Sequence, residues 1–234
     1  MPRITAIVPD GRRPGRFAVV VDGQTADAAV VGIDGVERLA LRVGRDVTER
    51  LAADLADENA AVRVYDRAVR LLAVRARSAA DLRRRLTRAD GAGGRGGRGS
   101  AGADPRHVSL ALDRLAAAGL VDDAEYARTR VRSRLRVQGS SARRLKQELA
   151  RDGVAADVAA DAVAEVFEDE AVDVTAIVEQ LARRRARMLS GSGLDPIVIR
   201  RRLYAFLARR GYGPDDVRRA VDAALDRASD EVPE

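Results

Sequence analysis

Few side chains in this 234-residue chain are of a type and spacing that could carry catalysis. The sequence has no cysteine, which excludes a thiolate nucleophile, a disulfide framework and a zinc ribbon. The single histidine, His107, has no second imidazole to pair with, and we expect it to be exposed or to cap a helix. The glycine-rich residues 91–102 lack the Gly-Lys-Ser/Thr ending of a phosphate loop. We therefore expect no catalytic residue, no metal and no cofactor.

Neighbouring carboxylates, which could in other settings act as acid and base, occur at residues 122–123, 168–170 and 215–216. We place all three groups at helix starts, where the positive end of the helix dipole stabilises negative charge. On this interpretation they support helices and do no chemistry.

Arginine is the functional group that recurs along the chain. The sequence has 42 Lys+Arg and 36 Asp+Glu, a formal net charge of +6, and Lys146 is its only lysine. Residues 1–58 hold 8 arginines and 10 acidic residues, so residues 59–234 carry a net charge of +8. The planar guanidinium suits phosphates and carboxylates. Enrichment in arginine at the expense of lysine also follows from a GC-rich genome, and composition alone leaves both explanations open.

The basic residues are grouped on successive predicted helices, at residues 128–136, 143–146, 183–187 and 200–202. In the first group only Arg128, Arg132 and Arg136 share a face, because helical residues two apart point in nearly opposite directions. A solvated surface is the simplest interpretation of each group. Basic groups at equivalent places in a repeat instead favour an extended acidic partner, either a nucleic acid or an anionic protein groove.

The segments that position these groups are of two kinds. In residues 1–45, β-branched stretches at 4–8 and 16–21 are separated by Pro/Gly breakers, and Asp22-Gly23 is a hairpin dipeptide. Residues 46–49 form a capping-box-like start for a helix that we expect to end near Asp57. Residues 1–58 are therefore predicted to form a small β-containing element and a short helix.

From Ala60 onward the apolar spacing is helical and strand signals are absent. Three Leu-x-x-x-Leu helices begin at Leu82, Leu145 and Leu203, and their offsets of 63 and 58 residues suit a three-helix unit. We predict three-helix repeats over residues 59–121, 122–168 and 169–230. The expected fold is mainly α, with tandem repeats forming an elongated curved body and a small N-terminal β-containing element.

The first repeat contains the insertion at residues 91–102, for which we expect a mobile loop. Its Arg-Gly-Gly character is that of nucleic-acid-binding tails, but with two arginines and no aromatic residue an inert linker is the simpler interpretation. The chain has no apolar run near the roughly 18 to 20 residues of a membrane span and no signal-peptide core. A soluble cytoplasmic protein is expected.

The central repeat resembles a known bacterial family. Residues 119–127 read Gly-Leu-Val-Asp-Asp-Ala-Glu-Tyr-Ala, followed by Gly139, by Arg-Leu-Lys-Gln-Glu-Leu at 144–149 and by Gly153-Val154. These residues are similar to those of the recombination regulator RecX, and the likeness extends over about residues 4–228, including 21–23, 41–44 and 65–86. The insertion departs from the family, which usually has a short Gly-aromatic turn at that place.

The resemblance implies a non-enzymatic modulator of the RecA recombinase, acting in homologous recombination, DNA repair and the SOS response. Such a protein lodges in the helical groove of the RecA filament on single-stranded DNA and usually restrains ATP hydrolysis and strand exchange. We expect a monomer that binds DNA weakly on its own and has no membrane partner.

By the same resemblance, residue roles fall into two sets. Within the motif, Asp122 and Asp123 would start the helix that carries Tyr126 and Ala127, Leu145 and Leu149 would pack the repeat, and Gly153 would supply a left-handed turn. The residues expected to contact the filament or its DNA are Arg128, Arg132, Arg136, Arg143, Arg144, Lys146, Arg184, Arg187, Arg201 and Arg202.

The alternative function is that of an autonomous nucleic-acid-binding helical protein, such as a helix-turn-helix-like repressor. Short helices and the +8 charge of residues 59–234 are compatible with it. A repressor, however, is expected to use a single recognition helix and dimer symmetry, whereas this sequence has three similar units.

Overall fold

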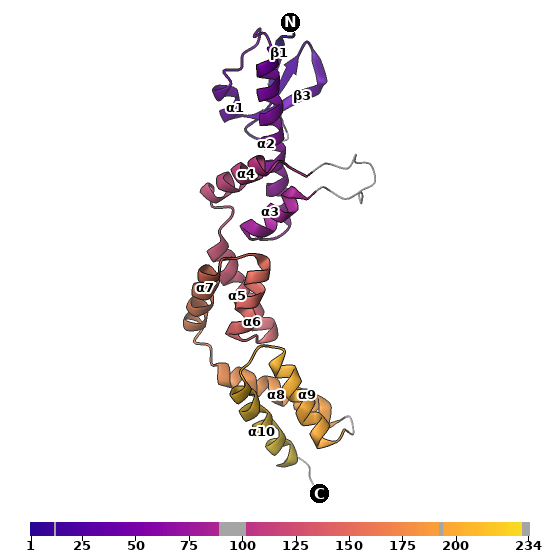
Figure 1. The fold of residues 1–234 in the computed structure, drawn as a ribbon, viewed down its shortest axis with the longest axis vertical. Coiled ribbons are helices and arrows are strands. Elements are labelled where there is room, and N and C mark those ends of the chain that lie inside the picture. The colour runs from indigo at the N-terminus through magenta and orange to yellow at the C-terminus, as the bar shows by residue number, and fades with distance from the viewer. Residues whose placement is uncertain (12, 89–101, 192–193, 231–234) are drawn as a thin grey trace. The chain divides into compact units, whose positions relative to one another are not determined.

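A computed structural model describes residues 1–11, 13–88, 102–191 and 194–230 (Figure 1). The chain forms two compact units, residues 1–121 and 122–234. The fold is mainly helical with one small antiparallel sheet near the N-terminus, which confirms the predicted fold class. Apart from Gly102, the insertion predicted as a loop lies outside the described residues.

The sheet has the strand order β1-β2-β3, with β1 (Ile4–Pro9), β2 (Arg16–Val21) and β3 (Gln24–Gly32) all antiparallel to their neighbours. Asp22 and Gly23 both have positive φ, 48° and 74°, and form the tight turn between β2 and β3. Ile4 and Val31 are fully buried and belong to the same apolar cluster as Leu51 on the following long helix.

Two helices follow the sheet, α1 (Ile33–Arg38) and α2 (Glu49–Val74). The predicted helix end near Asp57 is wrong, because α2 runs unbroken for 26 residues. The polar residues at this point tie the helix to its neighbours. Asn59 Oδ1 accepts a hydrogen bond from Val30 N at 3.2 Å, and the buried carboxylate of Glu58 pairs with Arg38. One helix thus serves both the N-terminal core and the first repeat.

Repeat 1 consists of the C-terminal half of α2 with α3 (Ala79–Thr87) and α4 (Pro105–Ala117). Ser78 Oγ caps α3 by accepting a hydrogen bond from Asp81 N at 3.1 Å. Asp104 caps α4 in the same way, at 2.8 Å from Arg106 N. The core of this repeat consists of Val64, Ala68, Leu82, Leu86, Val108, Ala111, Leu112, Leu115 and Val121.

His107 lies in the first turn of α4 but is buried, and its Nε2 is 2.9 Å from Asp57 Oδ1 on α2. The expectation of an exposed or capping histidine is therefore wrong. The ring is covered because α4 packs on α2, and Asp104 is the residue that supplies the cap.

Repeat 2 consists of α5 (Asp123–Gln138), α6 (Ala142–Asp152) and α7 (Ala156–Asp169). Asp122 Oδ1 caps α5 by accepting hydrogen bonds from Ala124 N and Glu125 N. Gly153 ends α6 with a φ of 86°, a left-handed conformation that favours glycine. The core consists of Ala127, Val131, Leu145, Leu149, Val154, Ala159, Ala162, Val163 and Val166.

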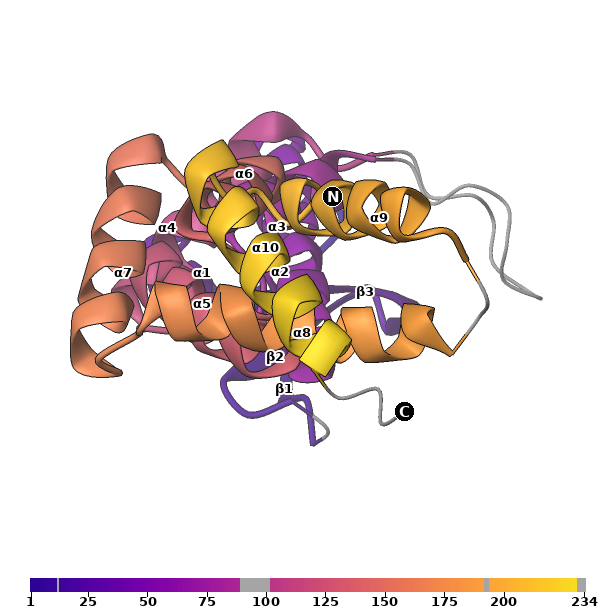
Figure 2. The same cartoon turned by 90° about the horizontal axis from the view of Figure 1, so that it is seen from below.

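Repeat 3 consists of α8 (Val174–Ser190), α9 (Pro196–Ala208) and α10 (Pro214–Asp230). Figure 2 shows α10 crossing α8, and α10 also packs on α9. Asp173 and Asp195 cap α8 and α9. The core contains Val178, Ala182, Ala186, Leu189, Ile199, Leu203, Leu207, Tyr212, Val217, Ala220, Val221 and Ala224. The separate cores of the N-terminal element and the three repeats support the division of the chain that we propose.

Candidate interaction surface

The predicted row of arginines on α5 exists, and it faces α7. Arg128 pairs with Glu165 at 3.2 Å and with Glu125 at 3.1 Å. Arg132 pairs with Asp169 at 3.1 Å, and both Arg132 and Arg136 reach Glu170 at 3.6 and 3.8 Å. The side chains of Arg128 and Arg132 are about one quarter and one third exposed, so the row joins two helices of the same repeat.

These pairs also explain the acidic residues 168–170, whose predicted place at a helix start is wrong. They lie at the C-terminal end of α7, where the helix dipole disfavours negative charge. The α5 guanidinium groups that reach Asp169 and Glu170 offset that effect. The other two carboxylate groups do lie at the starts of α5 and α10.

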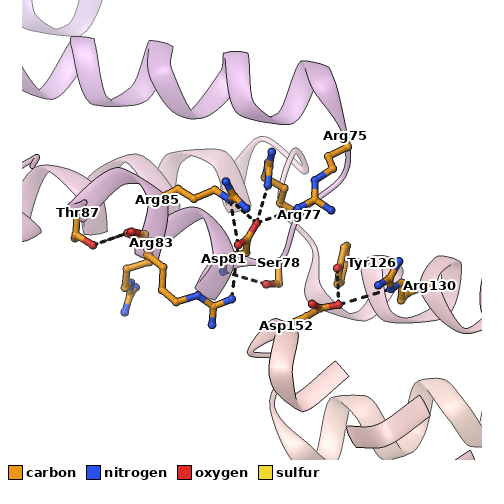
Figure 3. A network of polar contacts seen from close by, with 11 residues as sticks. Arg75, Arg77, Ser78, Asp81, Arg83, Arg85, Thr87, Tyr126, Arg130 and Asp152 are labelled. Carbon is orange, nitrogen blue, oxygen red and sulfur yellow. Dashed lines mark hydrogen bonds and ion pairs between the residues drawn. The ribbon is translucent and has the colours of Figure 1, made fainter. Parts of the chain in front are cut away.

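The remaining arginines of α5 hold α6. Arg134 pairs with Glu148 at 2.9 Å, and Arg144 pairs with the same carboxylate at 3.2 Å. Asp152 accepts a hydrogen bond from Tyr126 Oη at 2.9 Å and pairs with Arg130 at 3.7 Å (Figure 3). In repeat 2, six arginines are therefore matched by six carboxylates.

A second set of predicted contact residues lies on α6, α8 and α9 and is exposed. For these side chains the described part of the chain supplies no carboxylate partner within ion-pair distance. The set consists of Arg143, Lys146, Arg184, Arg187, Arg201 and Arg202. Two further exposed arginines, Arg151 and Arg209, stand at equivalent places six residues after the first leucine of α6 and α9. Sequence reasoning missed this last pair, which the repeat alignment could have shown.

Repeat 3 replaces an ion pair of repeat 2 by aromatic contacts. Arg134 and Arg185 each stand twelve residues after the aspartate that caps their helix, and Glu148 and Phe206 each stand three residues after the first leucine of theirs. Where Arg134 meets Glu148, Arg185 lies over the ring of Phe206 at 5.6 Å. Arg210 also lies over this ring, at 3.9 Å. Burial lowers the pKa of Arg210, and the nearby charges of Arg209 and Arg185 lower it further.

Repeats 2 and 3 meet at a close backbone joint. Tyr212 Oη donates a hydrogen bond to Gly139 O at 2.6 Å, and burial raises the pKa of Tyr212 to about 12. Ser141 N donates to Arg210 O at 3.3 Å. Gly211 has a φ of 83°, and a Cβ atom there would lie 2.6 Å from Ser141 Oγ. This joint fixes the start of α6 against the end of α9.

A basic cluster in repeat 1 escaped sequence reasoning altogether. Arg75 and Arg77 in the turn between α2 and α3 converge with Arg85 of α3 on Asp81 (Figure 3). Arg84 reaches the same carboxylate. The available signal was the composition of residues 75–88, which hold six arginines and one acidic residue.

The described residues contain no group of three or more His, Cys, Asp or Glu placed to hold a metal ion. Among the helices that the structure describes, none is both long and apolar enough to cross a membrane. The exposed arginines on this helical scaffold form the candidate binding surface.

Comparisons with known proteins agree with this scaffold. The models of the second and third three-helix domains of RecX match residues 122–163 and 173–221. The regulatory protein RecX of Amycolatopsis mediterranei is 40% identical over 144 residues, which are 61% of this chain and 71% of the relative. That of Mycobacteroides abscessus is 37% identical over 179 residues, covering 74% of this chain and 78% of the relative. The chain belongs to the RecX family.

Solved RecX structures share the fold. A crystal structure of regulatory protein RecX superimposes with a TM-score of 0.72 at 19% identity and covers 95% of this chain and 100% of that one. The RecX structure from Lactobacillus salivarius gives a TM-score of 0.54 at 17% identity. It covers 71% of this chain and 97% of the Lactobacillus chain. In this RecX-family chain the two matched domains begin where Asp122 and Asp173 cap α5 and α8.

Proposed function

We propose that this RecX-family chain regulates homologous recombination by binding in the groove of the RecA filament on single-stranded DNA. Binding would lower ATP hydrolysis and strand exchange by RecA without chemistry of its own. Family membership carries the proposal, since the relatives above are regulatory proteins RecX. We place this activity in the cytoplasm, in DNA repair and the SOS response, and assign it to a monomer.

The exposed cations support a polyanionic partner. Arg143 and Lys146 on α6 and Arg201 and Arg202 on α9 lie on the solvent side of helices whose leucines are buried. The joint at Gly139 and Tyr212 holds these two helices in one compact unit. A partner lined by acidic side chains and DNA phosphates would therefore meet both groups of charges together.

The helix-turn-helix alternative is less well supported. In a three-helix unit of that kind the last helix enters the major groove, between two rows of phosphates. The last helix of repeat 2, α7, contains Asp157, Asp161, Glu165, Glu168 and Asp169 and no basic residue. All five are exposed, so this helix would repel a DNA backbone.

The test is the DNA-dependent ATPase of RecA on a single-stranded circle, with strand exchange measured in parallel. We expect both activities to fall when the chain is added in near-stoichiometric amounts. Unchanged activities at that ratio would overturn the proposal. Sequence-specific binding to bare duplex DNA at about 0.2 M salt would support the repressor instead, because non-specific binding is weak there.

A further inference from the structure

The arginines around Asp81 differ from those of repeat 2 because their charge is not balanced. Asp81 is 2.8 Å from Arg77 and 3.0 Å from Arg85, while Arg84 and Arg75 reach it at 3.6 and 3.9 Å. One carboxylate thus meets four guanidinium groups, which leaves an excess of three positive charges. Such an excess within one small volume is stable only where solvent or another anion offsets it.

The centre of the cluster is fixed in place. The side chain of Arg77 is only 7% exposed, and its Nε donates a hydrogen bond to Leu71 O at 3.1 Å. Burial by itself would raise the pKa of Asp81, but hydrogen bonds from Arg77 and Arg85 hold it below its ordinary value. Asp81 also stands in the capped first turn of α3. The acid and its nearest arginine form a rigid base for the others.

The outer arginines point their remaining donors towards solvent. The side chains of Arg75, Arg84 and Arg85 are 58%, 53% and 44% exposed. Each guanidinium has five N–H donors, and one carboxylate can occupy only a few of those that surround it. Arg83 and Arg88 on the same segment are exposed as well, and no described carboxylate lies within ion-pair distance of either.

We propose that Arg75, Arg84 and Arg85, held around Asp81, form a phosphate-binding site for the backbone of single-stranded DNA. The proposal deepens the function proposed above and rests on it, since it assigns the DNA contact to repeat 1. Guanidinium forks bind phosphate oxygens in pairs, and Asp81 keeps three forks close together while leaving most of their donors available.

The distribution of charge favours a nucleic acid over an acidic protein segment. Arg84 and Arg85 reach Asp81, whereas Arg83 and Arg88 are exposed and lie outside this cluster, so positive charge extends along the segment beyond the Asp81 site. A flexible backbone with one charge per nucleotide can follow such a surface and releases counterions on binding. A folded acidic partner would match one face only.

The site is tested with the full-length chain alone, by fluorescence anisotropy of a labelled oligo-dT in a salt titration. The variant Arg75→Ala/Arg84→Ala removes two half-exposed side chains and should fold normally. We expect it to lose about tenfold in affinity at low salt, and its log–log salt slope to shrink by about 1.4, which corresponds to 0.7 per lost phosphate contact. Unchanged affinity and slope would overturn the proposal.

Two matched variants distinguish a loss of this site from a loss of net positive charge. Arg218→Ala/Arg219→Ala removes the same charge from α10, where each arginine pairs with an acid three residues earlier, and should bind nearly as wild type. Arg75→Lys/Arg84→Lys keeps both charges and should restore most of the affinity. If Arg75→Ala/Arg84→Ala and Arg218→Ala/Arg219→Ala lost equal affinity for oligo-dT, binding would depend on net charge alone. This outcome would overturn the site.

The same proteins in the RecA ATPase assay distinguish this site from the proposed function. If wild type leaves RecA unaffected while Arg75→Ala/Arg84→Ala loses DNA binding, the proposed function fails and the site stands. If wild type lowers the ATPase while the variant binds oligo-dT as wild type does, the site is overturned. A variant that loses only its effect on RecA would show that α3 contacts an acidic protein surface, which also overturns the DNA assignment.

Discussion

Repeats 1 and 2 pack their helices around similar leucines but use their arginines in opposite ways. In repeat 2, six arginines of α5 and α6 are matched by six carboxylates, most of them on other helices of the same repeat. In repeat 1, four arginines share Asp81. The number of arginines in a helix is therefore a poor guide to the charge that it offers to a partner. The position of the acids decides, and the fold sets that position.

The common element of the comparison is the Leu-x-x-x-Leu core, and breaking it should have the largest effect. Leu145 is 1% exposed, so Leu145→Ala should lower the free energy of unfolding by about 2–4 kcal/mol. Chemical denaturation measures the change. Leu120→Ala, at a leucine that is 52% exposed, is the matched control and should cost far less. A loss below about 0.5 kcal/mol at Leu145 would mean that this leucine is not part of the core.

The second-largest effect is expected in the affinity for the RecA filament, where unpaired cations should matter more than paired arginines. The variant Arg143→Ala/Lys146→Ala/Arg201→Ala/Arg202→Ala removes four exposed, unpaired cations. We expect it to keep its helical content and to bind the RecA filament at least about tenfold more weakly, because each lost charge contact weakens association with a polyanion. Co-sedimentation with the filament measures the affinity.

The paired row gives the contrasting variant, Arg128→Ala/Arg132→Ala/Arg136→Ala. These residues remain candidate contacts, so filament binding should weaken, but less than in the unpaired set because α7 already holds their charges. Thermal stability should fall slightly as the links between α5 and α7 are lost. If both variants lose affinity equally, pairing within the repeat has no bearing on the interface. If neither loses affinity, the contact surface is wrong.

The joint between repeats 2 and 3 should show a smaller and pH-dependent effect. Tyr212→Phe removes the hydrogen bond to Gly139 O and should cost about 0.5–1.5 kcal/mol at neutral pH. The pKa of Tyr212 is about 12 in the folded chain, whereas an unfolded tyrosine titrates near 10. The folded state thus holds the proton more tightly, and wild-type stability should fall as the pH rises from about 10 to about 12.

Absorbance of tyrosinate against pH measures this titration directly. Tyr212→Phe should remove the titration step near pH 12, and Tyr204→Phe, at an exposed tyrosine, should leave that step in place. If the step near pH 12 survives in Tyr212→Phe, Tyr212 is not the tyrosine whose pKa burial raises.

The smallest effect on stability is expected from the insertion that makes repeat 1 longer than repeat 2. Deleting residues 91–102 should change the unfolding free energy very little, since the entropy of closing a loop depends only weakly on its length. Denaturant unfolding of the deletion variant checks this. A large destabilisation would mean that the insertion packs on repeat 1 and is no inert linker.

Local signals predicted the helices and their caps well. Asp122 caps α5, the helix start at which the sequence placed it, because capping involves atoms only two or three residues apart. The hairpin at Asp22-Gly23 was predictable for the same reason. The leucine spacing identified buried positions in all three repeats.

Partners distant in sequence were not predictable from such signals. The partners of Arg128 and Arg132 on α7 lie 37 residues away, so the face shared by these arginines was visible but its neighbour was not. The burial of His107 depends likewise on Asp57, 50 residues earlier. The continuity of α2 was missed because Glu58 and Asn59 interrupt the apolar pattern, although they bind neighbouring elements.

Imaging the chain on a RecA filament assembled on single-stranded DNA, by electron cryo-microscopy, tests the account most directly. We predict density in the filament groove, with the exposed sides of α6 and α9 towards the filament and the acidic α7 away from it. A filament without bound density at saturating chain, or one that the chain contacts through α7, would contradict the account.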